Sequence, residues 1–159
     1  MDILYNLLFV LILILIVVFV IIRLRQKLFS LWKEVSYREI IFHRLLSESI
    51  VAFYNQKEFL KNEENRLQFV RLGRSRRKKA RHLLLKERQE LYLCVSDIYN
   101  EIEELETDQF NELKHQFDRL QKARRIYNSK VLLYNQTISV FPTRFLAIKM
   151  NLKIKEYFG

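Results

Sequence analysis

The stretch that decides the fold is FNELKHQFDRLQKARRIYNSKVLLYNQTISVFP, residues 110–142. Large apolar side chains return along it at alternating steps of three and four residues, interrupted only by Arg124. The series is Phe110, Leu113, Phe117, Leu120, Arg124, Tyr127, Val131, Tyr134, Ile138 and Phe141. A seven-residue period of this kind is typical of long helices that pack along a seam. The stretch therefore predicts one long helix, which Pro142 ends or kinks because proline has no amide hydrogen to donate.

Two earlier stretches show the same period. Their members are Leu24, Leu28, Leu31, Val35, Arg38, Phe42, Leu45, Ser49, Ala52, Gln56 and Phe59, and then Leu84, Arg88, Leu91, Val95, Ile98, Ile102 and Leu105. Three long helices joined by two turns predict an all-α antiparallel bundle with a short C-terminal segment, residues 142–159. A homo-oligomeric coiled coil would use the same seams, so self-association stays open.

The expected breaks between these helices follow from residue type. Asn62, Asn65 and Gly73 weaken or end the first helix, and Thr107-Asp108 supplies turn and N-cap chemistry before the third. The chain of 159 residues has only two glycines and one proline, which also favours a few long helices over many short elements.

The N-terminal stretch ILYNLLFVLILILIVVFVII, residues 3–22, predicts a membrane-spanning helix. Twenty helical residues at a rise of about 1.5 Å cover a hydrocarbon core of about 30 Å. A cleaved signal peptide would need a positively charged start, a shorter apolar core and a small-residue cleavage site, none of which is present. We therefore expect an uncleaved anchor at residues 1–22 that contacts the lipid bilayer through residues 3–22.

Basic residues flank only one end of this stretch. Arg23, Arg25, Lys27 and Lys33 follow it, whereas only Asp2 precedes it. The positive-inside rule then places the N-terminus outside and residues 23–159 in the cytoplasm. A reducing cytoplasm also suits the lone Cys94, for which a buried structural thiol is the expected role.

The sequence carries no pattern that predicts an enzyme, a metal site or a cofactor. It has no glycine-rich phosphate loop, nucleophile elbow or HExxH pattern. Its three histidines are scattered, and none has a second ligand-type residue at a metal-site spacing. We expect a protein without catalysis or cofactors.

Two arginines break the apolar seams. Counting from the predicted turn puts Arg88 and Arg124 at nearly the same level of the bundle, opposite Glu48-Ser49. Buried charges need a partner, so either Glu48 neutralises the arginines in a polar layer or they reach outward to water. The outward arrangement is the favoured expectation.

The last third of the chain, Leu105 to Phe158, resembles the C-terminal part of the LemA family. The motif elements in order are Ala123-Arg124-Arg125, Tyr127-Asn128, Val131, Tyr134-Asn135, Phe141-Pro142, Ala147 and Tyr157-Phe158. Where family members usually have Gly-Phe-Lys before the final Tyr-Phe, this chain has Asn151-Leu152-Lys153. The resemblance implies a membrane anchor followed by a helical bundle, and the family as a whole has no established enzymatic activity.

The repeated Tyr-Asn pair is a candidate partner-binding site. The tyrosines belong to the seam, whereas Asn128 and Asn135 flank it two turns apart, and Arg125 lies one turn before Asn128. These three side chains could grip a backbone or a partner helix. The favoured expectation is that the amides and hydroxyls satisfy neighbouring groups inside the bundle.

Positive charge is concentrated in RLGRSRRKKAR, residues 71–81, and negative charge in DIYNEIEELETD, residues 97–108. The part of the chain after residue 22 has a net charge of +11, since it holds all 28 basic and 17 of the 18 acidic residues. We expect the first segment to be a loop at the far end of the first helix, and the second to be a turn close to the bilayer. The candidate polyanion-binding residues are Arg71, Arg74, Arg76, Arg77, Lys78, Lys79 and Arg81.

These patterns favour a membrane-anchored helical scaffold or interaction module with an unidentified protein partner. The alternative is a membrane-tethered protein that binds nucleic acid or other polyanions without sequence preference through residues 71–81. Aromatic side chains are not interleaved with these basic residues, so specific nucleic-acid recognition is not expected.

Overall fold

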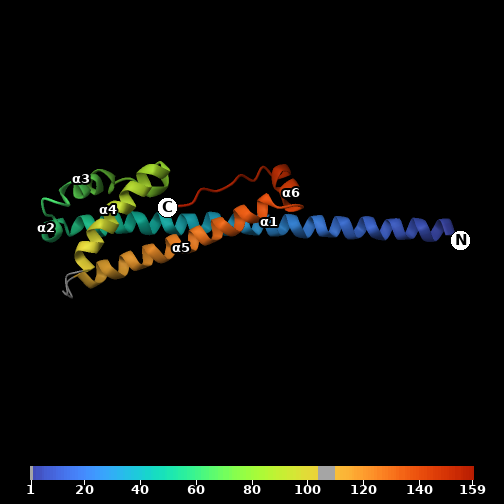
Figure 1. The fold of residues 1–159 in the computed structure, drawn as a ribbon, viewed down its shortest axis with the longest axis horizontal. Coiled ribbons are helices and arrows are strands. Elements are labelled where there is room, and N and C mark those ends of the chain that lie inside the picture. Colours follow the sequence, from blue (N-terminus) through green and yellow to red (C-terminus); the bar gives the residue numbers. More distant parts are fainter. Residues whose placement is uncertain (1, 104–109) are drawn as a thin grey trace. The chain divides into compact units, whose positions relative to one another are not determined.

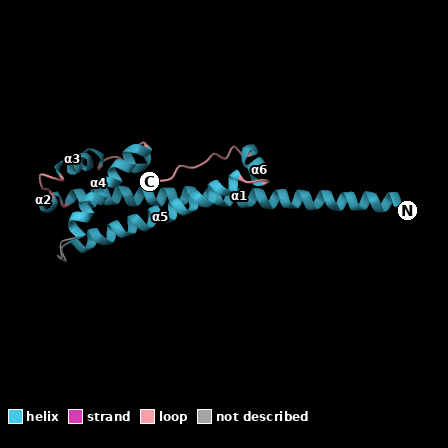
Figure 2. Cartoon of the chain, viewed as in Figure 1, coloured by secondary structure: helices cyan, strands magenta, loops and turns pink. Residues whose placement is uncertain are grey.

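A computed structural model describes residues 2–103 and 110–159, and every regular element in these ranges is a helix (Figures 1 and 2). The elements are α1 (Asp2–Asn55), α2 (Lys57–Leu60), α3 (Arg66–Ser75), the 3₁₀ turn η1 (Ala80–His82), α4 (Leu85–Glu103), α5 (Asn111–Ser139) and α6 (Thr143–Lys149). The predicted all-α class is confirmed. The turn expected at Thr107-Asp108 lies outside the described residues.

Helix α1 is long and apolar enough to cross a membrane. Its side chains from Leu4 to Ile22 are all exposed, although all but Asn6 are apolar or tyrosine. Burial begins with Leu28, which is fully covered. The predicted apolar stretch and the predicted seam thus belong to one continuous helix.

The chain forms two compact units. The first combines Met1–Val35 with Lys130–Glu156, and the second combines Ser36–Ser129 with Tyr157–Gly159. In the first unit, the core includes Leu28, Val35 and Tyr134. An ion pair joins Lys130 Nζ to Glu34 Oε1 at 2.8 Å on its partly exposed side.

The core of the second unit confirms most of the predicted seam positions. Fully or nearly fully buried members are Phe42, Leu45, Ser49, Leu91, Val95, Ile98, Ile102, Phe110, Leu113, Phe117, Leu120 and Tyr127. Three terminal members are wrong: Phe59 and Leu84 here, and Phe141 in the first unit, are exposed. Each of the three stands next to a helix end, where the chain leaves the straight path that the period assumes.

Helix directions within the second unit follow from its contacts. Helix α5 runs antiparallel to α1, because Phe117 meets Phe53 whereas Tyr127 meets Phe42 further back along α1. Helix α4 instead runs parallel to α1. Its early residue Arg88 contacts His43, and its late residue Glu101 reaches Asn65 beyond the end of α1. The unpredicted helix α3 makes this possible, because it returns along the bundle before α4 begins and packs against α4.

Gly73 was expected to weaken or end the first helix, and this is wrong. Helix α1 already ends at Asn55, and Gly73 lies inside α3. A Cβ atom at this position would stand 2.8 Å from Tyr54 Cε2. The glycine therefore allows α3 to approach the Tyr54 ring.

Helix α6 ends in a Schellman motif, the hydrogen-bonded turn in which a left-handed residue closes a helix. Leu152 N donates to Ala147 O at 2.9 Å, and Asn151 N donates to Ile148 O at 3.0 Å. Asn151 has φ of 53°, in the left-handed region that favours glycine. Apart from glycine, asparagine is among the residues that best tolerate this conformation.

Candidate functional site on helix α5

The first asparagine of the Tyr-Asn repeat binds backbone in the second unit. Asn128 Nδ2 donates to Phe158 O at 2.7 Å, and Phe158 N donates to Asn128 Oδ1 at 2.9 Å. Both polar ends of one side-chain amide are thus paired with both polar groups of one residue. This arrangement binds an extended chain through its backbone and does not depend on the identity of its side chains.

The second asparagine does the same in the first unit. Asn135 Nδ2 donates to Lys155 O at 2.8 Å, and Lys155 N donates to Asn135 Oδ1 at 2.9 Å. Next to it, the buried Tyr134 donates its hydroxyl to Lys153 O at 3.0 Å. Burial raises the pKa of Tyr134 above its ordinary value of 10.0, so the hydroxyl keeps the proton that this bond requires.

The backbone bound by the repeat is the chain's own C-terminal segment, residues 151–159, which has no helix (Figure 2). The expectation that the amides satisfy neighbouring groups is confirmed for Asn128 and Asn135. Arg125, the third candidate, is exposed and donates to Gln121 Oε1 at 3.2 Å. Partner binding by these three residues stays a prediction.

Phe158 adds an aromatic anchor to the amide contacts of the second unit. Its ring is 1% exposed and lies 4.5 Å from the Phe42 ring and 5.7 Å from the Tyr92 ring, centroid to centroid. Helical periodicity could not find it, because the segment that carries it is extended. The final Tyr-Phe of the family motif was the one signal in the sequence that pointed to it.

The two seam arginines are half-buried and use aromatic rings in place of a carboxylate. Arg88 Nη1 contacts His43 Nε2, and Arg124 Cζ lies 4.6 Å from the centroid of the Tyr92 ring. Tyr92 follows Arg88 by one helical turn, so the predicted common level is confirmed. Burial raises the pKa of Tyr92, and the charge of Arg124 opposes that rise.

The alternative arrangement, in which Glu48 neutralises both arginines, is wrong. The Glu48 carboxylate is exposed and faces Arg44, with Oε1 3.7 Å from Nε. The direction of α4 explains the difference, because the start of α4 reaches α1 at His43 instead of at Glu48.

The basic segment, residues 71–81, is only partly a loop. Arg71 and Arg74 belong to helix α3, and Arg81 belongs to η1. All seven of its basic side chains are exposed. Its expected place at the far end of the first helix is wrong, because Ala80 N donates to Ser47 Oγ at 3.0 Å, two turns before α1 ends. Lys79 and Arg81 line a cavity of about 420 Å³ together with Arg44.

The acidic segment, residues 97–108, was expected to form a turn close to the bilayer, and this is wrong. Glu101 Oε2 accepts from Asn65 Nδ2 at 2.7 Å and from Asn62 Nδ2 at 3.2 Å, just beyond the distal end of α1. Asn62 and Asn65 also exchange backbone-to-side-chain bonds of 2.9 and 2.7 Å, which order the turn between α2 and α3. The described part of this segment therefore closes the distal end of the bundle. Its residues 104–108 lie outside the described ranges.

Chemically reactive groups do not converge in the described ranges. Cys94 is buried, and burial raises the pKa of its thiol while a hydrogen bond from Arg71 lowers it. Residues 4–103 and 110–159 contain no group of three histidine, cysteine or acidic side chains arranged to hold a metal ion. The site can bind an extended backbone, and that is the chemistry that its geometry supports.

Comparison with known proteins agrees with the motif. The family model described as the LemA family matches residues 75–159, a little more than half of the chain and a wider range than the motif itself. Neither the curated proteins nor the solved structures give a match. With the Tyr-Asn repeat, the final Tyr-Phe and the family match in one continuous range, the chain belongs to the LemA family.

Proposed function

We propose that the chain is a membrane-anchored helical scaffold that binds other proteins and has no catalytic activity. The observation that supports this best is the continuity of α1, which runs from Asp2 to Asn55 without a break. The same helix carries the apolar stretch and, from Leu28 onward, side chains of the buried core. In the proposed topology, residues 1–22 anchor the chain with the N-terminus outside, and residues 23–159 form the cytoplasmic part.

The topology is tested with introduced cysteines in a Cys94→Ala background. Asp2→Cys should react with a membrane-impermeant thiol reagent in intact cells. Val70→Cys, which is exposed on α3, should react only after permeabilisation. The reverse pattern would contradict the orientation, and labelling of both positions in intact cells would contradict membrane spanning.

The scaffold role is tested by photocrosslinking in native membranes. A photoreactive residue at Arg125 or at the exposed Leu93 should give discrete protein adducts that survive nuclease treatment. The matched control is the same chain with a glycine-serine linker inserted after Arg23, which keeps the anchor and the bundle but uncouples them. Identical adducts with and without the linker would show that partner binding does not need a continuous α1.

The second candidate function is polyanion binding by the basic segment, residues 71–81. It is favoured by the exposure of all seven basic side chains of this segment. Changing Arg76, Arg77, Lys78 and Lys79 to Gln should make the plot of the logarithm of polyanion affinity against the logarithm of salt concentration less steep, by about three to four in slope. The control changes four other exposed basic residues, Arg66, Lys86, Arg119 and Lys122, to Gln. Loss of cellular function in the first variant alone would favour this candidate over the scaffold.

A further inference from the structure

The corner between α5 and α6 exposes large apolar side chains that nothing in the bundle accounts for. Phe141 is 85% exposed, and Phe145 and Ile148 are also largely exposed. Phe145 and Ile148 lie three residues apart on one face of α6, and Phe141 lies two residues before this helix begins. These three exposed side chains are called the stripe here. The opposite face of α6 is covered through Thr143 and Ala147. The stripe is thus an outward apolar surface on an ordered element.

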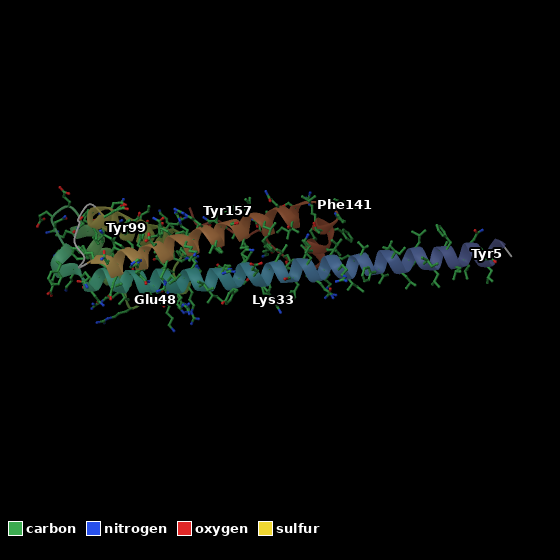
Figure 3. All side chains as sticks on the ribbon, turned by 90° about the horizontal axis from the view of Figure 1, so that it is seen from below. Tyr5, Lys33, Glu48, Tyr99, Phe141 and Tyr157 are labelled. Carbon is green, nitrogen blue, oxygen red and sulfur yellow. The ribbon has the colours of Figure 1, made fainter. Side chains whose placement is uncertain are left out.

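A groove separates this corner from α1 in the first unit. It has a volume of about 760 Å³ and is lined by Ile16, Val20 and Ile21 on one side and by Phe141 and Phe145 on the other. Figure 3 shows Phe141 beside α1 at a level between Lys33 and Tyr5. The corner therefore lies next to the second half of the apolar stretch, with Arg25 at the edge of the groove.

The depth of the corner follows from the helix rise. Ile16 precedes Ile22 by six residues, which corresponds to about 9 Å along the helix axis. The hydrocarbon of one leaflet is about 15 Å thick. If residues 3–22 span the bilayer, a group at the level of Ile16 to Ile21 lies below the headgroups. A depth of about 5–10 Å is usual for interfacial amphipathic helices.

Charged residues mark the boundary on the same elements. Lys149 and Arg25 stand at the polar edge of the groove, and Arg144 is exposed on α6. Lys149 Nζ lies over the Phe145 ring, 4.9 Å from its centroid, so a basic group stands directly at the apolar surface. Long basic side chains at this level extend to lipid phosphates. Apolar surface continuous with the span and a basic rim both favour lipid as the occupant over a protein.

We propose that the α5–α6 corner inserts Phe141, Phe145 and Ile148 into the leaflet on the bundle's side, and that acyl chains fill the groove against α1. The chain then contacts the bilayer at two places, through the span and through this corner. The inference rests on the proposed membrane anchor. Its test must therefore separate failure of the anchor from failure of the corner.

Tryptophan quenching by brominated acyl chains makes that separation. The full chain with Trp32→Phe is reconstituted into vesicles of phosphatidylcholine and phosphatidylglycerol, and one tryptophan is placed at Phe19, Phe141, Phe145 or Val70. Bromine in the acyl chains should quench the Phe19→Trp, Phe141→Trp and Phe145→Trp fluorescence to a similar extent. Val70→Trp, exposed on α3, should keep its intensity. Far-UV circular dichroism checks that each variant is folded.

The possible outcomes are distinct. Quenching at Phe19 without quenching at either corner position would overturn the inference and leave the anchor standing. Absence of quenching at Phe19 would overturn the anchor and the inference together. Two corner positions are used so that a folding defect at one leaves the other as the test.

Discussion

Replacing Asn128 by alanine should loosen the C-terminal segment from helix α5. The change removes the two hydrogen bonds of 2.7 and 2.9 Å to Phe158 and leaves the Phe158 backbone groups without these partners. A hydrogen bond contributes about 1 kcal/mol net, and an unsatisfied buried group costs about 1–3 kcal/mol. The Asn128 site is partly buried, so we expect a loss of about 2 kcal/mol in the free energy of unfolding.

A double-mutant cycle with Phe158 shows whether Asn128 acts through the segment. Phe158→Ala alone should cost about 3–5 kcal/mol, because its ring fills the space between Phe42 and Tyr92. Once that anchor is lost, the segment no longer stays near Asn128. Adding Asn128→Ala should then cost much less than in the intact chain, with a coupling of about 1–2 kcal/mol.

Urea unfolding of the full chain in micelles, followed by circular dichroism, measures these values. Asn100→Ala is the matched control, since it removes an exposed asparagine from α4 and should change stability by less than about 0.5 kcal/mol. We call the pairing of Asn128 and Asn135 with the backbone of the C-terminal segment the clamp. An Asn128→Ala variant as stable as the Asn100→Ala control would refute it, as would losses in the free energy of unfolding that simply add in the double variant.

Four further outcomes are expected from the same unfolding assay. Asn151→Ala should lose about 1 kcal/mol because of its left-handed φ, whereas Asn151→Gly should stay within about 0.5 kcal/mol; equal effects would contradict a role for the conformation. Tyr134→Asp should lose about 4 kcal/mol by placing a charge in the seam, and a near-wild-type melting curve would mean that residue 134 faces water. The folded-state pKa of Tyr134 is raised, so its contribution to the free energy of unfolding is complete below about pH 10 and is lost as pH rises through the folded-state pKa. Tyr134→Phe should therefore flatten the loss of stability at alkaline pH. An unchanged dependence of stability on pH would count against this role of the hydroxyl. Glu48→Gln should be silent within about 0.5 kcal/mol, because Glu48 is exposed and pairs with exposed Arg44, and a large loss would support the carboxylate layer.

The buried face of each long helix could be predicted from the sequence, but the path of the chain between helices could not. The seven-residue period identifies Phe117 and Tyr134 as buried because burial follows the helical repeat. The same period holds whichever way a helix runs, so it could not show that α4 is parallel to α1. That direction depends on the reversal through α3, where Phe69 and Leu72 supply only a short buried face.

The Tyr-Asn repeat was predictable as packing but not as a clamp. Periodicity describes only the helix, and the backbone that Asn128 and Asn135 bind is an extended segment with no helical repeat. Amide groups on a helix flank have the same sequence pattern whether they meet water, a partner or the chain itself. The structure shows that these amides bind the chain itself, because the backbone of Lys155 and Phe158 lies beside them.

The spacing of the two asparagines works as a ruler. Seven helical residues advance about 10.5 Å, and three extended residues advance about 10 Å. Asparagines seven apart therefore match backbone positions three apart, here Lys155 and Phe158. Since each amide binds only backbone, these two contacts do not depend on which side chains stand at positions 156 and 157. One residue inserted between the two bound positions would instead shift the segment by about 3.3 Å and leave one asparagine without its backbone partner. Between residues 155 and 158, the two amide contacts therefore constrain the number of residues more than their identity.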